Sequence, residues 1–126
     1  MPYEYDDQNI FAKVLRHEIP NDTVMETDFT LAFRDITPAA PEHILVIPKG
    51  SYVNYDHFAT DATDAEILDF TRVVGAITHT IKVAPDGGGN GYRLITNAGH
   101  DGVQDVPHMH MHIIAGRRLG RMIQPA

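Results

Sequence analysis

The stretch VPHMHMHIIAG, residues 106–116, carries the strongest structural and chemical signal in this chain. It places three histidines at alternate positions, His108, His110 and His112. In an extended strand successive side chains point to opposite faces, so the three imidazoles share one face at a spacing of about 6.7 Å. Met109, Met111 and Ile113 fall on the other face. The stretch therefore predicts a strand with a histidine face and a core face.

The histidine face indicates chemistry near neutral pH. Imidazole can act there as a base, an acid, a nucleophile or a metal ligand. Protonation of one ring disfavours protonation of its neighbours, so we expect at least one of the three to be neutral and nucleophilic near pH 7. Zinc is the main alternative, because two of these rings could reach one ion and His43 could be another ligand. The chain has no cysteine, and no glutamate adjoins the run to act as the partner base, so a site without a metal is favoured.

Composition restricts the class of protein. The 126 residues, 43% of them hydrophobic, are enough for one domain with a single core, which we expect to span residues 1–126. The lack of cysteine excludes disulfides and thiolate zinc sites. A formal net charge of −7 argues against nucleic-acid binding and favours a small ligand. We see no secretory signal and no apolar run that could span a bilayer, so we expect a cytoplasmic protein without a membrane partner.

The first half of the chain reads as one helix followed by strands. Asn9 is suited to cap a short helix over residues 10–16, and Pro20 prevents its continuation. Residues 23–27 and 30–36 are β-favouring runs that predict a hairpin. The nearly continuous apolar run over residues 43–48 predicts a strand buried on both faces, central in a sheet.

The second half begins with the longest predicted helix. Thr63 and Glu66 have the spacing of a capping box, and an apolar stripe follows them until the helix ends near Pro85. The glycine-rich run after Pro85 precedes a strand and lacks a Lys-Ser/Thr pair, so it predicts a turn rather than a phosphate loop. Residues 92–96 form the next strand, and the histidine strand follows. This order predicts an α+β domain with an antiparallel sheet.

Several blocks of this sequence resemble the histidine triad superfamily, in particular its small Hint-like nucleotide-binding branch. The similarity includes the H-x-H-x-H run, the preceding Asn97-Ala98-Gly99 and Gln104, the stretch NIFAKVLRHEIP of residues 9–20, and LAFRDITPAAPEHILVIPK of residues 31–49. It covers residues 9–118 in the same order. The resemblance implies a five-stranded antiparallel sheet with one short N-terminal helix and one long helix. It also implies a homodimer whose subunits share a ten-stranded sheet.

The resemblance also implies the roles of the histidines. His110 would be the nucleophile that attacks the α-phosphorus of a nucleotide substrate and forms a covalent nucleotidyl-histidine, which water then hydrolyses. His112 would contact the phosphate. His108 and His43 would orient the site and provide hydrogen bonds.

Further residues would bind the nucleotide. Asp35 matches the carboxylate that accepts the ribose hydroxyls, which orients the nucleoside without selecting a base. Asn97 and Gln104 match polar contacts near the phosphate and the leaving group. The apolar walls of the base pocket would be Phe11, Val14, Phe33 and Ile36.

Two positions depart from this pattern. Val103 stands where a glycine often precedes the glutamine, and Asp105 stands where a serine or threonine often follows it. A carboxylate only accepts hydrogen bonds and repels phosphate, so Asp105 turns away, is protonated, or serves a basic leaving group. We favour the last, an amine that departs from a phosphoramidate.

The residues and the resemblance together predict a metal-independent hydrolase that cleaves nucleoside monophosphate derivatives. Purine nucleoside phosphoramidates are the substrates that the resemblance favours. One alternative is a dinucleoside polyphosphate hydrolase or a nucleotidyl transferase, which would share the covalent intermediate. A second alternative is a nucleotide-binding or partner-binding module that does not catalyse a reaction.

Overall fold

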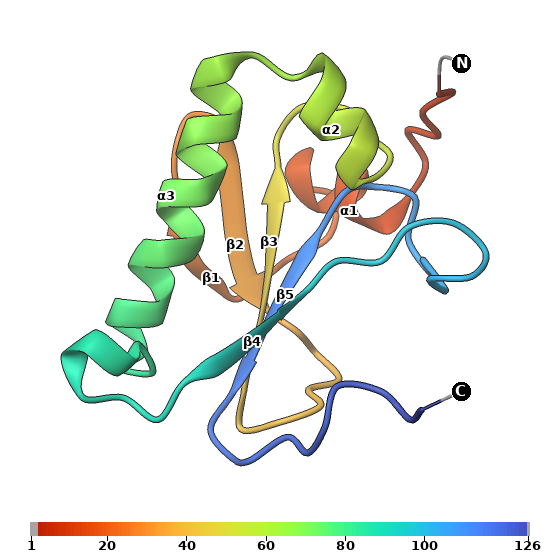
Figure 1. The fold of residues 1–126 in the computed structure, drawn as a ribbon. Helices are drawn as coiled ribbons and strands as arrows, with labels where there is room; N and C mark the ends of the chain where they lie inside the picture. The colour runs from red at the N-terminus through yellow and green to blue at the C-terminus, as the bar shows by residue number, and fades with distance from the viewer. Residues whose placement is uncertain (1–2, 126) are drawn as a thin grey trace.

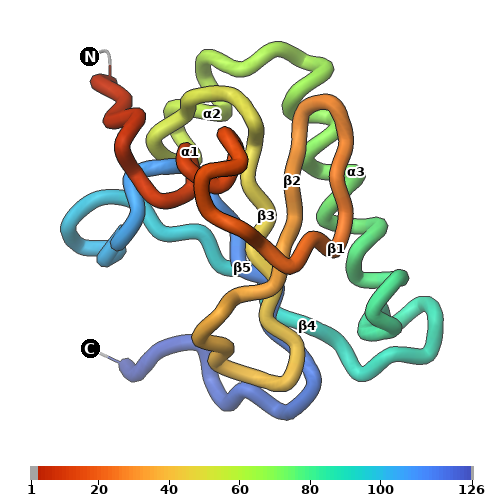
Figure 2. Tube along the Cα trace, turned by 180° about the vertical axis from the view of Figure 1, so that it is seen from behind, coloured from red at the N-terminus to blue at the C-terminus, as the bar shows by residue number. Residues whose placement is uncertain are grey.

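The computed structural model describes residues 3–125, which form one five-stranded antiparallel sheet with helices on both faces. The strands lie in the order β1-β2-β3-β5-β4. Helices α2 and α3 lie in front of the sheet in Figure 1, and α1 lies behind it, where Figure 2 shows it from the other side. In chain order the elements are α1 (Ile10–Leu15), β1 (Thr23–Glu26), β2 (Thr30–Arg34), β3 (Glu42–Pro48), α2 (Tyr55–Asp61), α3 (Asp64–Thr80), a 3₁₀ turn (Pro85–Gly87), β4 (Tyr92–Ile95) and β5 (Met111–Ala115).

The predicted α+β class and the antiparallel sheet are confirmed. The first two strands pair as the expected hairpin, and β3 lies at the centre of the sheet with six of its seven residues buried. Side chains also join the hairpin to the long helix. Asp69 on α3 accepts hydrogen bonds from Thr27 at 2.6 Å and from Thr30 at 2.7 Å.

Local capping accounts for the two predicted helices. The side chain of Asn9 accepts a hydrogen bond from the amide of Ala12 at 2.9 Å, as expected of an N-cap. The capping box of Thr63 and Glu66 is present at the start of α3. The prediction that this helix continues to near Pro85 is wrong, because α3 ends at Thr80 and the chain turns at Lys82 with φ of 63°.

Helix α2 was not predicted from the sequence. It has seven residues, of which Phe58 is buried, so it shows no repeating apolar stripe. Asn54 caps it by accepting a hydrogen bond from the amide of His57 at 3.0 Å.

The histidine strand is shorter than predicted. Strand β5 begins at Met111, so His108 and His110 precede it. Strand β3 ends at Pro48, which has no amide hydrogen to donate to a ladder. Met109 instead donates its amide to the carbonyl of Tyr52 at 2.8 Å.

The alternation of faces nevertheless continues through the whole run. Two apolar clusters fill the two sides of the sheet. The cluster under α3 includes Met109 and Ile113 and consists of Ala32, Ile44, Val46, Phe58, Phe70, Val73, Val74, Ile77, Met109 and Ile113. The cluster under α1 consists of Phe11, Val14, Leu31, Phe33, Leu45 and Ile47. The predicted core face is therefore the α3 side, and the histidines lie on the α1 side.

No helix within residues 3–125 is both long enough and apolar enough to cross a membrane.

Candidate active site

The structure gathers the three histidines and His43 on the α1 side of the sheet. The ring centroids of His110 and His112 are 5.2 Å apart, and those of His43 and His112 are 5.1 Å apart. Phe11 of α1 packs edge-on against His110 at 5.0 Å. His108 is fully buried and His110 is 6% exposed, so the backbone and nearby side chains determine how each ring is held.

The hydrogen bond of His110 determines which of its nitrogens is free. Nδ1 lies 2.7 Å from the backbone carbonyl of His108. A carbonyl can only accept, so Nδ1 of His110 carries the hydrogen. In the neutral ring Nε2 then has a free lone pair, which is the form that a nucleophile requires.

His108 is held at both nitrogens. Nε2 donates to the carbonyl of Pro48 at 2.8 Å. Nδ1 of the neutral ring is then an acceptor, and the hydroxyl of Tyr5 lies 2.5 Å from it.

A chain of hydrogen bonds likewise determines which ring nitrogen carries the hydrogen in His43 and in His112. The amide of Ala39 donates to Nδ1 of His43 at 2.9 Å, so Nε2 of His43 carries the hydrogen. That nitrogen lies 2.8 Å from Nδ1 of His112 and donates to it. The hydrogen of neutral His112 is therefore on Nε2. The pair presents an N–H donor at His112 beside the lone pair of His110.

Burial keeps the triad neutral. It lowers the pKa of His108 to about 4. Burial also lowers the pKa of His112 to about 4, with the neighbouring His110 and His43 acting in the same direction. Burial lowers the pKa of His110 as well, although the hydrogen bond to the His108 carbonyl and the charges of Asp105 and Asp35 oppose this shift. Neutral rings near pH 7 agree with the expectation from the sequence.

Asp35 lies at the edge of this cluster. Its Oδ1 accepts a hydrogen bond from the amide of Thr37 at 2.8 Å, and its Oδ2 is 3.4 Å from Nε2 of His43. Asp35, His43 and His112 each have one potential metal-ligand atom within 4.8 Å of the other two, a spacing that could hold a metal ion.

The tautomer of His43 opposes a metal at this cluster. A histidine that binds a metal through Nε2 carries its hydrogen on Nδ1 and donates it to an acceptor. Nδ1 of His43 instead faces the amide hydrogen of Ala39. Metal binding through Nε2 of His43 would therefore place the Nδ1 hydrogen of His43 against the amide hydrogen of Ala39.

The apolar residues expected around the base divide into two groups. Phe11, Val14 and Phe33 are buried in the cluster under α1, where Phe11 and Phe33 pack edge-on at 5.7 Å. Ile36 follows Asp35 and is 93% exposed. The first three are core residues, and Ile36 is accessible to a ligand.

The polar residues predicted near the phosphate lie on the loop between β4 and β5. The amide nitrogen of Gln104 donates to the carbonyls of Val53 at 2.6 Å and Val106 at 2.9 Å, which ties this loop to the segment before α2. Asn97 is partly exposed, and Asp105 is exposed. Val103 has φ of 55°, the left-handed conformation that favours glycine.

Three residues that sequence reasoning did not assign to the site also support it. Tyr5 contacts His108 as described above. The hydroxyl of Thr96 donates to the carbonyl of His110 at 2.8 Å, and Arg117 donates to the carbonyl of Ala39 at 3.0 Å. Thr96 directly follows strand β4, which is a weak signal, and no local pattern marks Tyr5 or Arg117.

Comparisons with known proteins agree with this fold. The family model of the HIT domain matches residues 16–119. An uncharacterized HIT-like protein of Azospirillum brasilense is 51% identical over 123 residues, 98% of each chain. The purine nucleoside phosphoramidase of Escherichia coli K12 is 40% identical over 117 residues, 93% of this chain and 94% of that protein. The solved structure of a histidine triad protein from Clostridium difficile has a TM-score of 0.78 and 37% identity, covering 96% of this chain and 100% of that one. A HIT family hydrolase from Clostridium thermocellum has a TM-score of 0.78 and 30% identity, covering 94% of this chain and 99% of that one.

Proposed function

The chain belongs to the HIT domain family, and from that premise we propose that it hydrolyses purine nucleoside phosphoramidates through a nucleotidyl intermediate on His110. Its similarity to HIT family hydrolases supports the reaction class. The name of the 40% identical Escherichia coli relative supports the substrate class.

One observation carries this proposal. The carbonyl of His108 holds the hydrogen of His110 on Nδ1, which leaves the Nε2 lone pair free beside the N–H donor of His112. A nucleophile and a donor for phosphoryl oxygens are then positioned before substrate binds, so little reorganisation is needed during the reaction.

Two displacements at phosphorus follow from this arrangement. Nε2 of His110 forms a bond to the α-phosphorus, and the P–N bond to the amine breaks as the amine takes up a proton from water. The oxygen of a water molecule then bonds to phosphorus, the bond to Nε2 breaks, and the proton of that water passes to solvent. The products are a nucleoside monophosphate and a free amine, and His110 returns to its initial form. Nε2–H of His112 donates to a phosphoryl oxygen in both steps.

Asp35 and Ile36 are suited to bind the nucleoside. The Asp35 carboxylate is near His43 and accepts hydrogen bonds, as the ribose hydroxyls require. The exposed side chain of Ile36 is next to it in the chain and provides an apolar contact for the base.

Mass spectrometry of protein quenched during turnover of an adenosine phosphoramidate tests the mechanism. We expect an adenylyl group on the peptide that contains His110. His110→Asn and His110→Gly abolish the adduct and turnover, and each still binds nucleotide. His79→Asn is the matched control, because His79 is exposed at the end of α3 and pairs with Asp86.

The same experiment separates the alternatives. Turnover without an adduct, or with an adduct on another residue, contradicts the mechanism. An adduct that passes to an added acceptor in preference to water supports a nucleotidyl transferase. Cleavage of a dinucleoside polyphosphate in preference to the phosphoramidate supports the other hydrolase. Nucleotide binding that is the same in wild type and His110→Asn, without turnover of either substrate, supports a binding module.

Asp105 gives a prediction about the leaving group. Its exposed carboxylate precedes the buried triad and can accept a hydrogen bond from a departing ammonium-like amine. We expect Asp105→Ser to lower kcat/KM for a phosphoramidate of a basic alkylamine by about tenfold. This factor corresponds to the loss of one charge-assisted hydrogen bond. Turnover of a phosphoramidate whose leaving group carries no positive charge should change less. Faster release of the basic amine in Asp105→Ser contradicts this role.

We also propose that the reaction needs no metal, because the amide of Ala39 holds Nδ1 of His43 as an acceptor. Treatment with a strong chelator should leave kcat unchanged, and added zinc should not raise it. Activity that is lost to the chelator and restored by zinc contradicts this proposal.

A further inference from the structure

Tyr5 lies close to the triad although 103 residues separate it from His108 in the chain. Its hydroxyl is 2.5 Å from Nδ1 of His108, and the two rings meet edge-on with centroids 5.6 Å apart. Tyr5 is half-buried and His108 is fully buried. This contact joins the N-terminal segment to the centre of the site.

The direction of this hydrogen bond follows from the other side of the ring. Nε2 of His108 donates to the carbonyl of Pro48, so Nδ1 is an acceptor and Tyr5 donates to it. Within residues 3–125 no buried side-chain nitrogen or oxygen is left without a partner. Without the Tyr5 hydroxyl, Nδ1 of a fully buried ring would lose its hydrogen bond.

The position of His108 matters because its own backbone holds His110. The carbonyl of His108 accepts the hydrogen of His110 Nδ1 at 2.7 Å. Phe11 packs edge-on against both rings, with centroids 6.4 Å from His108 and 5.0 Å from His110. A shift of the His108 ring would therefore move the two groups that orient His110, which are the His108 carbonyl and the Phe11 ring.

The N-terminal segment is itself anchored to α1. The carbonyl of Asp6 accepts hydrogen bonds from the backbone amide of Asn9 at 3.3 Å and from its side chain at 2.7 Å. Arg16 donates to the carbonyl of Asp7 at 2.7 Å. Because Asp6 and Asp7 directly follow Tyr5 in the chain, these contacts also hold Tyr5 in place.

We propose that Tyr5 is a positioning residue that holds the His108 ring in place through its hydrogen bond to Nδ1, so that the His108 carbonyl keeps Nε2 of His110 free for attack. Its role in catalysis rests on the proposed function of His110. The contact with His108 and the tautomer are properties of the folded protein and can be measured without substrate.

Tyr5→Phe tests this role, with Tyr3→Phe as the matched control. The Tyr3 hydroxyl also makes hydrogen bonds, to Asp56 and from Asn54 at 3.0 Å, but not to the triad. With an adenosine phosphoramidate as substrate, we expect Tyr5→Phe to lower kcat by roughly tenfold or more, because small displacements of reacting groups are costly. KM should change by less than about twofold, and Tyr3→Phe should leave both constants within about twofold, because neither hydroxyl is expected to touch substrate.

The ¹⁵N shifts of the histidine rings at pH 7 provide a readout that a loss of stability alone would not produce. We expect wild-type His108 to be the Nε2–H tautomer with a hydrogen-bonded Nδ1, and Tyr5→Phe to move the Nδ1 signal toward that of a free acceptor. An Nδ1–H tautomer in the wild type overturns the proposal, even if Tyr5→Phe does not fold. A loss of kcat in Tyr5→Phe no larger than in Tyr3→Phe also overturns it. A wild type without turnover or an adduct on His110 would instead refute the proposed function and leave the tautomer measurement intact.

Discussion

The chemistry of each histidine depends on what its second nitrogen contacts. His110 faces a carbonyl and keeps a lone pair on Nε2, whereas His43 faces an amide and becomes a donor through Nε2. These two rings belong to the same residue type and lie on the same side of the sheet, yet they carry their hydrogens on different atoms. Single backbone groups therefore determine which nitrogen carries the hydrogen in each ring.

The buried histidines make folding stability depend on pH. Burial holds the pKa of His108 at about 4, below its ordinary value of 6.5, so between these values the unfolded chain binds a proton that the folded chain does not. The stabilisation is complete above pH 6.5 and is lost as the pH falls toward 4. For His108 alone we expect the free energy of unfolding to fall by on the order of 1–2 kcal/mol between pH 7 and pH 5.

Urea unfolding at pH 7 and pH 5 measures this dependence. His108→Gln cannot titrate in this range, so its free energy of unfolding should decrease by less between the two pH values than that of the wild type. Equal decreases in the two proteins would show that His108 does not contribute.

At the scale of elements, the loop between β4 and β5 positions the first two histidines. Because His108 and His110 precede β5, sheet hydrogen bonds do not hold them as they hold His112. Contacts to Pro48, Tyr52 and Thr96 replace the missing ladder. The geometry of this loop is therefore part of the site.

Val103 is the strained position of that loop. A β-branched residue at φ of 55° costs about 1–2 kcal/mol relative to a conformation that it prefers. We expect Val103→Gly to leave the free energy of unfolding unchanged or raise it by up to about 1 kcal/mol, since glycine relieves the strain but loses more chain entropy on folding.

Val106→Gly is the matched control in the same loop. Val106 packs against the cluster under α1 and has no positive φ, so its replacement should lower stability by about 1–2 kcal/mol. Thermal or urea unfolding of both variants measures the difference. A destabilised Val103→Gly would show that the Val103 side chain contributes more than its strain costs.

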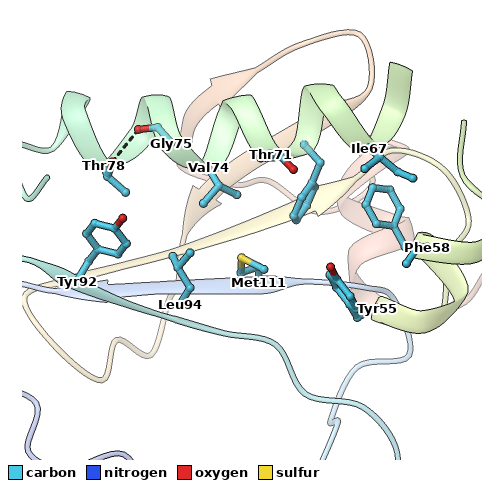
Figure 3. Close-up of a pocket in the computed structure, with 12 residues that line it drawn as sticks. Tyr55, Phe58, Ile67, Thr71, Val74, Gly75, Thr78, Tyr92, Leu94 and Met111 are labelled. Carbon is cyan, nitrogen blue, oxygen red and sulfur yellow. Dashed lines mark hydrogen bonds between the residues drawn. The ribbon is translucent and has the colours of Figure 1, made fainter. Parts of the chain in front are cut away.

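At the scale of the whole molecule, strand β4 and the surface next to it are open. Strand β4 pairs with β5 on one side, and its other edge is the end of the sheet. An apolar hollow of about 430 Å³ lies between this edge and α3. Tyr92, Leu94 and Met111 are among the residues that line it (Figure 3). Open sheet edges and apolar hollows favour association with another chain. We propose that a second copy covers this surface, as the family resemblance implies.

Size-exclusion chromatography with light scattering tests this association. We expect the wild type to be a dimer and Leu94→Glu to be a monomer, because Leu94 lines the hollow and is 41% exposed in the isolated chain. Leu68→Glu is the control, since Leu68 is 56% exposed on α3 and does not line the hollow. A dimer that persists in Leu94→Glu contradicts this interface.

Patterns that depend on neighbouring residues could be read from the sequence. The alternation of residues 108–113 separates the histidines from the core residues, and the caps at Asn9 and Thr63 mark both predicted helices. The apolar run of β3 indicates the centre of the sheet. These features follow from local geometry, which repeats every few residues and so leaves a signal in the sequence.

Contacts between distant segments required the tertiary structure. The hydrogen bond from Tyr5 to His108 leaves no signal in the sequence, because it depends on where a remote part of the chain is placed. Helix α2 leaves no periodic signal, and the hydrogen bond from Ala39 to His43, four residues apart, depends on the conformation of the loop before β3. Sequence spacing placed the three imidazoles on one face. The end of β3, the loop between β2 and β3 and the loop before β5 decided which nitrogen of each ring carries a hydrogen, since only the folded chain determines which backbone group each ring faces.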